Sequence, residues 1–147
     1  MSKSQAFCTM TVGDKLFGID VMQVQEIIGD QHITPVPLAP SPALGLLNLR
    51  GEIVPAISLR AALGLEENAD DEHTTHVVVR RASGRLASLV VDGIGDVVDV
   101  DHSAFEAPPD TLSGKARELV RGVYKLERRL LLELDIDRAL AVGGNRV

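Results

Sequence analysis

The chain contains an internal repeat, and this repeat constrains its fold more than any other feature. Residues 16–28, LFGIDVMQVQEII, align with residues 86–98, LASLVVDGIGDVV, at an offset of 70 positions. Residues 45–63, GLLNLRGEIVPAISLRAAL, align with residues 122–140, GVYKLERRLLLELDIDRAL, at an offset of 77. Glycine, acidic and alanine–leucine positions match in the same order in both copies. Such a repeat predicts two similar small modules packed against each other.

Strand signals dominate each copy. Apolar residues alternate on both sides of Gly13-Asp14 and of Ser83-Gly84, which predicts two hairpins. Short apolar runs add strands at 53–59 and 129–136. In the first of them, Pro55 indicates a strand edge or a bulge because proline cannot donate to a sheet. Short helices are expected at 20–28, with Asp20 as N-cap, at 59–64 and near 135–144.

These signals predict an all-β fold with a few short helices, organised as two small β-barrels. We expect the first barrel to span about residues 16–75 and the second about 76–142. The N-terminal strand at 6–13 is expected to pack with the second barrel. Closing each sheet into a barrel would protect the strand edges from pairing with other chains.

Composition narrows the class of protein. With 147 residues and 45% hydrophobic side chains, the chain has the size and make-up of one globular domain. Its net charge of −6 argues against nucleic-acid binding, which needs clustered cations. No apolar run has the length of a membrane span, so we expect a cytoplasmic protein without membrane insertion. One cysteine, Cys8, excludes an intramolecular disulfide.

The segment at 45–60, GLLNLRGEIVPAISLR, places charge inside an apolar pattern. Leu49 has a leucine counterpart in the second copy, Leu126, and is therefore expected in the core. Arg50 and Gly51 have no matching counterpart, which makes them candidates for function rather than fold. Gly51 is expected to supply a turn or bulge conformation. For Arg50, a salt bridge to a nearby glutamate (Glu26 or Glu52), simple solvation and a functional anchor all remain open.

This segment resembles the signature of the CheW-like domain family, the coupling (adaptor) proteins of chemotaxis, through Gly45, Asn48-Leu49-Arg50-Gly51 and Ile53-Val54-Pro55. Residues 17–28 resemble an earlier family segment, and residues 122–140 resemble its C-terminal strands and helix. The resemblance runs from about residue 6 to 142, and implies a single CheW-like domain of two five-stranded SH3-like barrels. One departure is Ser58, where family members usually carry aspartate; its hydroxyl can still cap a helix.

The resemblance also implies a function. Family members have no catalytic activity and couple transmembrane chemoreceptors to the histidine autokinase CheA. For this chain no cofactor and no metal are expected. This implies a cytoplasmic protein recruited to the inner face of the membrane through receptors. The receptor would place the tip of its helical hairpin in a groove between the barrels, and head-to-tail contacts with kinase domains or other CheW-like domains would build rings.

Site residues follow from the matched positions. One groove wall would carry Val24, Glu26 and Ile27, and the other Asn48, Leu49 and Arg50, with Gly51 shaping the strand. A barrel end would contact the kinase regulatory domain, with Gly45, Leu46 and Leu47 as candidates.

Two other functions are alternatives to this one. An enzyme would need convergent groups, yet the acidic clusters, Asp70-Asp71-Glu72 and Asp96/Asp99/Asp101, read as solvated surface, as do the neighbouring His73 and His76. No phosphate loop, nucleophile elbow or zinc motif is present. The nearer alternative keeps the fold and places the protein in a pilus-motility or other chemosensory pathway.

Overall fold

The computed structural model describes residues 4–37, 43–65, 75–112 and 114–141. They form two five-stranded sheets and a few short helices, which confirms the expected all-β fold class. Barrel A has the strand order β8-β1-β2-β10-β9 and barrel B the order β3-β6-β7-β5-β4. The strands of barrel A are β1 (Ser4–Val12), β2 (Lys15–Asp20), β8 (Gly93–Asp101), β9 (Val120–Lys125) and β10 (Leu130–Leu134). Those of barrel B are β3 (Val24–Ile28), β4 (Ala43–Leu49), β5 (Glu52–Ser58), β6 (Thr75–Arg80) and β7 (Leu86–Val91).

The repeat is visible in the topology. Strands β2, β3, β4 and β5 of the first copy correspond to β7, β8, β9 and β10 of the second, and the two sheets have the same order under this correspondence. Each sheet contains one parallel pair, β2 with β10 in barrel A and β7 with β5 in barrel B. The two predicted hairpins are confirmed as antiparallel pairs, β1–β2 and β6–β7.

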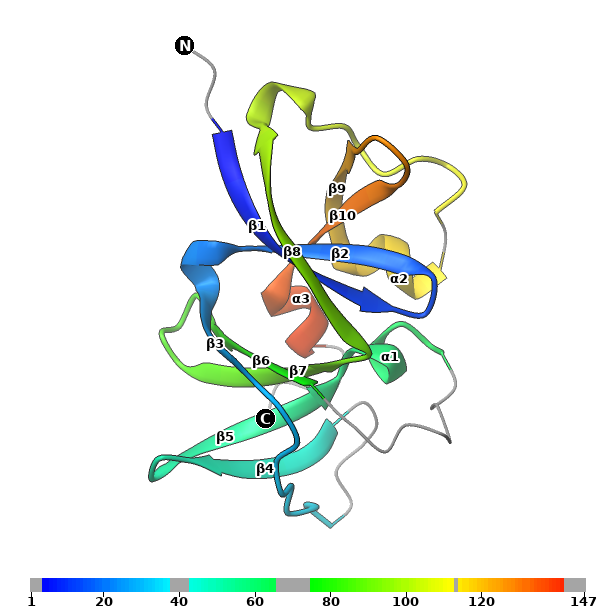
Figure 1. The fold of residues 1–147 in the computed structure, drawn as a ribbon. Helices are drawn as coiled ribbons and strands as arrows, with labels where there is room; N and C mark the ends of the chain where they lie inside the picture. Colours follow the sequence, from blue (N-terminus) through cyan, green and yellow to red (C-terminus); the bar gives the residue numbers. More distant parts are fainter. Residues whose placement is uncertain (1–3, 38–42, 66–74, 113, 142–147) are drawn as a thin grey trace.

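The two copies exchange strands between the sheets. After the hairpin β1–β2 in barrel A, the chain leaves that sheet and enters barrel B as β3; after β6–β7 in barrel B, it returns to barrel A as β8 (Figure 1). Sheet membership therefore does not follow the expected division of the chain into 16–75 and 76–142. The strand expected at 6–13 lies, as β1, in the sheet that holds β8, β9 and β10.

Each barrel closes through one bridge outside its named strands. In barrel B the segment after β3 pairs through Thr34 with Leu46 of β4, with N···O distances of 2.8 and 2.9 Å. In barrel A the segment after β8 pairs through Glu106 with Val123 of β9, at 2.9 and 2.8 Å. The bridging segments pass so close to the strand that only glycine fits beneath them. This accounts for the matched glycines of the repeat, Gly45 and Gly122.

The buried apolar residues of the described ranges form three clusters. The interior of barrel B holds Leu47, Leu49, Val54, Ala56, Val78 and Val90, and that of barrel A holds Phe7, Leu16, Val100, Tyr124 and Leu131. The largest cluster lies between the sheets and draws on β1, β2, β5, β6, β7, β9, β10 and the helices. Helix α3 (Ile136–Ala141) lies between the two sheets (Figure 1). Strands β6 and β7 are each buried over four or more consecutive residues, so both of their faces are covered.

The predicted helix at 20–28 is wrong over most of its length. A single 3₁₀ turn, η1 (Val21–Gln23), forms with the Asp20 carboxylate accepting the Met22 N–H at 2.9 Å, so the expected N-cap is confirmed. From Val24 the chain is extended as β3 and pairs with β6. Tertiary pairing with an apolar strand outweighs the local helical spacing of three apolar residues.

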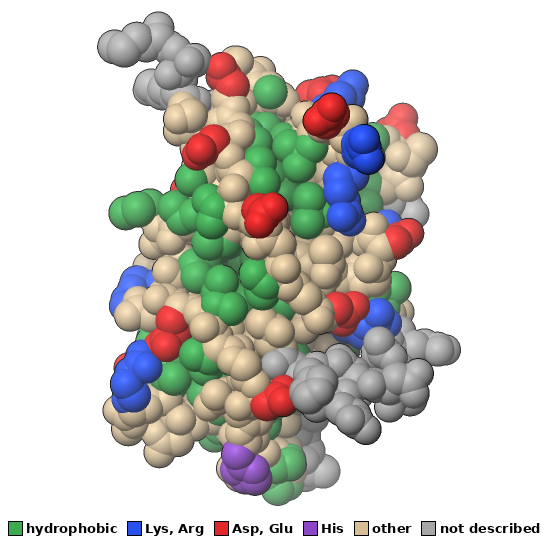
Figure 2. Space-filling view, viewed as in Figure 1, with side chains coloured by type: hydrophobic (Ala, Val, Ile, Leu, Met, Phe, Trp, Pro, Cys, Tyr) green, Lys and Arg blue, Asp and Glu red, His purple; other side chains and the backbone are tan. Residues whose placement is uncertain are grey.

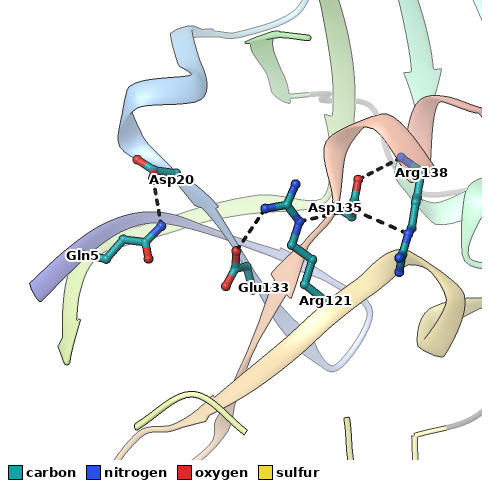
Figure 3. Close-up of polar contacts among 6 residues, drawn as sticks. All are labelled: Gln5, Asp20, Arg121, Glu133, Asp135 and Arg138. Carbon is teal, nitrogen blue, oxygen red and sulfur yellow. Dashed lines mark hydrogen bonds and ion pairs between the residues drawn. The ribbon is translucent and has the colours of Figure 1, made fainter. Parts of the chain in front are cut away.

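The remaining helices are short, and side chains cap the starts of α1 (Leu59–Ala62) and α3. Helix α1 is followed by Gly64 at φ 77°, and α2 (Gly114–Leu119) precedes β9. At the start of α1, the Ser58 hydroxyl accepts the Ala61 N–H at 3.1 Å. At the start of α3, Asp135 accepts the Arg138 N–H at 3.1 Å and also receives the Arg121 Nε at 3.1 Å (Figure 3). Ser58 and Asp135 occupy matching positions of the repeat, so serine caps α1 in the same way as aspartate caps α3.

Replacing Ser58 by alanine is expected to lower the free energy of unfolding by about 1 kcal/mol, because the cap of α1 is lost in a mostly buried position. Ser58→Asp is expected to retain the cap, since aspartate performs it at the matching position. Urea denaturation of the wild-type protein and both variants measures this difference. Equal loss in the two variants would show that the hydroxyl matters through packing rather than capping.

Candidate functional site

The tip of the β4–β5 hairpin is a two-residue turn formed by Arg50 and Gly51. Both residues have positive φ angles, 50° for Arg50 and 88° for Gly51, as a type I′ turn requires. The Asn48 side-chain oxygen accepts the Gly51 N–H at 2.8 Å and closes the turn. The expected turn role of Gly51 is confirmed. The turn also explains Asn48, whose amide is engaged in shaping the hairpin.

Arg50 reaches from this turn to Glu26 on β3. Its Nη1 donates to Glu26 Oε2 at 3.2 Å and its Nη2 to Glu26 Oε1, which makes a bidentate ion pair. The hydrogen bond from Arg50 lowers the pKa of Glu26, and the same bond raises the pKa of Arg50. The Arg50 side chain stays 69% exposed while that of Glu26 is 23% exposed. Of the two glutamates considered from the sequence, Glu26 is the partner.

The two predicted walls of the receptor groove lie on one barrel. Strands β3 and β4 are at opposite ends of the sheet order, but closure of barrel B makes them neighbours, so Glu26 and Arg50 meet there. Ile27 is 41% exposed, whereas Val24 is half-buried against the core between the sheets. Leu49 is buried inside barrel B and supports the turn from beneath.

An apolar surface that the sequence pattern does not predict lies beside this pair. Met22, Ile94 and Val97 are 86%, 41% and 61% exposed, on η1 and β8. Figure 2 shows hydrophobic side chains gathered on the face along which β3 and β8 run. The repeat could have predicted the exposure of Val97, because Val97 aligns with Ile27. The pairings of β3 and of β8 also have a register irregularity at the matching place.

The three candidates for the kinase contact differ in exposure. Gly45 is buried, with the backbone of Thr34 and Pro35 directly over it, and Leu47 is 2% exposed inside barrel B. Leu46 is half-buried and points to the outer face of the β4–β5 hairpin, opposite Pro55. Strand β5 lies between β7 and β4, so Pro55 is not at a sheet edge as the sequence predicted. Because Leu46 opposite it exchanges its backbone hydrogen bonds with Thr34, Pro55 need not donate an N–H to β4.

Two matching hollows lie where the parallel strand pair of each barrel diverges. The hollow of barrel B is lined by Glu52, Ile53, Pro55, Arg81, Arg85 and Leu86. The hollow of barrel A is lined by Asp14, Lys15, Leu16, Pro109, Thr111, Leu112, Arg129, Leu130 and Leu132. Ile53 corresponds to Leu130, and Leu86 to Leu16, in the repeat. Ile53 is 60% exposed and Leu130 is 38% exposed, so both hollows have an accessible apolar residue at the rim.

The acidic residues weighed as an enzyme site do not converge in the described part of the chain. Asp96, Asp99 and Asp101 are exposed along β8, and Asp101 caps the 3₁₀ turn η2 (His102–Ala104). Glu133, whose pKa is raised by burial, and Asp135 both lie against Arg121 (Figure 3). Within the described ranges no group of three or more His, Cys, Asp or Glu side chains could hold a metal ion. Asp70-Asp71-Glu72 and His73 lie outside the described residues.

Among the described residues, every helix is too short or too polar to cross a membrane.

Comparison with known proteins agrees with this architecture. The CheW-like domain matches residues 6–142. The chain is 35% identical over 127 residues to the chemotaxis protein CheW of Rhizobium meliloti, covering 86% of this chain and 81% of that protein. It is 34% identical over 137 residues to CheW of Klebsiella aerogenes, with 93% and 82% covered. A crystal structure of the scaffolding protein TtCheW from Thermoanaerobacter tengcongensis superposes with a TM-score of 0.82 at 26% identity, covering 90% of each chain. The chain therefore belongs to the CheW-like domain family.

Proposed function

We propose that this protein is a non-catalytic adaptor that couples transmembrane chemoreceptors to the histidine autokinase CheA. Its relatives are chemotaxis proteins, and the solved neighbour is a scaffolding protein. The observation that carries the proposal is the bidentate Glu26–Arg50 pair, presented at an exposed turn beside an apolar surface. An adaptor needs separate surfaces for its partners, and the receptor and kinase contacts can be placed on different faces of barrel B.

The receptor contact is proposed on β3 and the β4–β5 turn. Arg50 is held in place by Glu26 yet keeps most of its surface accessible, so its remaining N–H groups can donate to carbonyls or a carboxylate of a helical hairpin tip. Exposed Ile27, Met22 and Val97 supply the apolar area that a helix in a groove buries. Asn48 and Gly51 fix the turn that presents Arg50.

The kinase contact is proposed on the outer face of β4 and β5. Leu46, Ile53 and Pro55 share this face, and the hollow of barrel B adjoins it. Gly45 and Leu47 support it from within rather than by contact. The matching hollow on barrel A gives the molecule a second, similar surface. Two such surfaces on one chain suit head-to-tail assembly with related barrels into rings.

Replacing Arg50 by alanine is expected to weaken binding of a soluble receptor hairpin-tip fragment at least about tenfold, since an anchoring charged donor is removed. The melting temperature is expected to stay within experimental scatter, because the ion pair is exposed and alanine has the same Cβ at the left-handed turn position. Isothermal titration calorimetry and a thermal melt measure the two quantities separately.

The matched control is Glu127→Ala, which changes the aligned position of barrel A. Glu127 is exposed and the proposed receptor contact does not include it, so this variant is expected to bind like the wild-type protein. Unchanged binding by Arg50→Ala would remove Arg50 from the receptor contact. Failure of the wild-type protein to bind both a receptor fragment and a CheA regulatory domain from the same genome would overturn the proposed function itself.

A further inference from the structure

The interior of barrel B contains a buried polar pair, His76 and Ser88. Both side chains are fully buried, and His76 Nδ1 lies 2.8 Å from Ser88 Oγ. They belong to the hairpin β6–β7 and share the face that carries Val78 and Val90 into the apolar interior. A core made otherwise of valine, leucine and alanine does not need an imidazole for packing.

Barrel A shows what the fold requires at these two positions. In the hairpin β1–β2, Phe7 pairs with Asp20 as His76 pairs with Val90, and Gly18 aligns with Ser88. Phe7 is fully buried, lies over Gly18 and contacts the Tyr124 ring at a centroid distance of 5.5 Å. The same topology is therefore filled by an apolar pair in one barrel and by a titratable pair in the other.

The His76 imidazole has one satisfied nitrogen. Its Nε2 is buried and has no hydrogen-bond partner within the described part of the chain. A neutral ring can leave one nitrogen as an unused acceptor, but a protonated ring must bury a second N–H donor and a positive charge. Burial accordingly lowers the pKa of His76, and the charge of Asp30 opposes this only in part.

We propose that the His76–Ser88 pair makes barrel B acid-sensitive, so that protonation of His76 loosens the pairing of β3 with β6 while barrel A stays intact. In this pairing His76 lies opposite Ile28, and Ile28 follows Glu26 by two residues on β3. Because the unfolded chain takes up the proton first as the pH falls, the stability supplied by neutral His76 is complete at alkaline and neutral pH. It is lost as the pH falls below the usual histidine pKa of about 6.5.

Among the residues that the structure describes, the charge that acts on the His76 pKa is that of Asp30, which follows β3. Glu26 on β3 is bonded to Arg50, and Asp92 after β7 is bonded to Arg60. On β6 itself, Arg80 donates to Gln25 and to the Gly84 carbonyl. Glu52 on β5 lines the outer hollow and is exposed.

The test measures stability against pH in the full-length protein. Between pH 7.5 and 5.5 the wild-type melting temperature is expected to fall by at least about 3 °C more than that of His76→Gln, which keeps a hydrogen-bonding group but does not titrate. Hydrogen-exchange protection factors are expected to drop at pH 5.5 in β3 and β6 and to persist in β1 and β2. The exposed His32→Gln variant serves as the matched control and is expected to keep the wild-type pH dependence.

A second variant tests the proposal even if His76→Gln does not fold. His76→Phe with Ser88→Gly copies the pair found in barrel A and is expected to be equally insensitive to pH. The proposal is overturned if the wild-type protein and these variants show the same pH dependence, or if both barrels lose protection together. Neither result depends on receptor or kinase binding, so the proposed adaptor function is tested separately.

Discussion

Replacing Gly45 by alanine is expected to lower the free energy of unfolding by about 3 kcal/mol or more, which is the range of severe backbone and overpacking defects. A Cβ at this position would collide with the Thr34 carbonyl and lie 2.9 Å from Pro35 Cα, both backbone atoms that cannot swing away. The φ of 146° is also unfavourable for a side chain. Denaturant unfolding monitored by circular dichroism measures the loss.

The chain provides graded controls for this prediction. Gly29→Ala is expected to change stability little, because a Cβ there meets nothing within 4 Å. Gly122→Ala is expected to fall between the two, since its Cβ meets the partly exposed Phe105 ring as well as the Glu106 carbonyl at 2.6 Å. If Gly45→Ala were as stable as Gly29→Ala, the bridge from Thr34 to Leu46 would not be needed to close barrel B.

Replacing Asp92 by alanine is expected to cost about 1–2 kcal/mol, after allowing for partial solvent screening, because one carboxylate joins parts of both barrels. Arg60 of α1 donates to it twice, Nε to Oδ1 at 3.2 Å and Nη2 to Oδ2 at 3.0 Å. The Gly13 N–H, at the β1–β2 turn, donates at 2.8 Å. The loss is expected to appear as a lower midpoint of unfolding than that of the wild-type protein, which urea denaturation measures.

Because of the Asp92 carboxylate, we expect the free energy of unfolding to depend on pH in the acid range. Burial acts to raise the pKa of Asp92, but hydrogen bonds from Arg60 and Gly13 outweigh it and lower the pKa. Its stabilising effect is therefore present above the usual aspartate pKa of about 3.9 and is lost as the pH falls through the lowered value. Asp99→Ala, at an exposed position of β8, is the control and is expected to keep the wild-type profile. If Asp92→Ala and the wild-type protein lost stability in the same way at acid pH, this role of Asp92 would be contradicted.

Local sequence signals located most of the secondary structure. Gly13-Asp14 and Ser83-Gly84 marked the two hairpins correctly, because turn chemistry depends on neighbouring residues alone. The turn at Gly51 and the caps at Asp20 and Ser58 were predictable for the same reason. The segment at 24–28 was misread as helix because its extended form is imposed by β6, a strand about fifty residues away.

The candidate site was predictable in its residues but not in its arrangement. The repeat separates Arg50 and Gly51 from the residues that the fold requires, and the sequence offers Glu26 and Glu52 as alternative partners of Arg50. The sequence did not show that β3 and β4 become neighbours, because this contact depends on closure of barrel B through Thr34. The sequence also did not show that Ile94 and Val97 are exposed, since an exposed apolar residue on an edge strand has the same sequence pattern as a core residue.

By itself, the sequence determined the all-β class, the repeat, the turns and the caps, since each depends on short-range patterns of apolar, glycine and capping residues. Only the tertiary structure decided that the two copies exchange strands through β3 and β8, that Arg50 pairs with Glu26, and that His76 is buried. The physical reason is that strand pairing and burial join residues far apart in the chain. The packing of the two sheets decides which distant strand forms hydrogen bonds with the edge of a given strand.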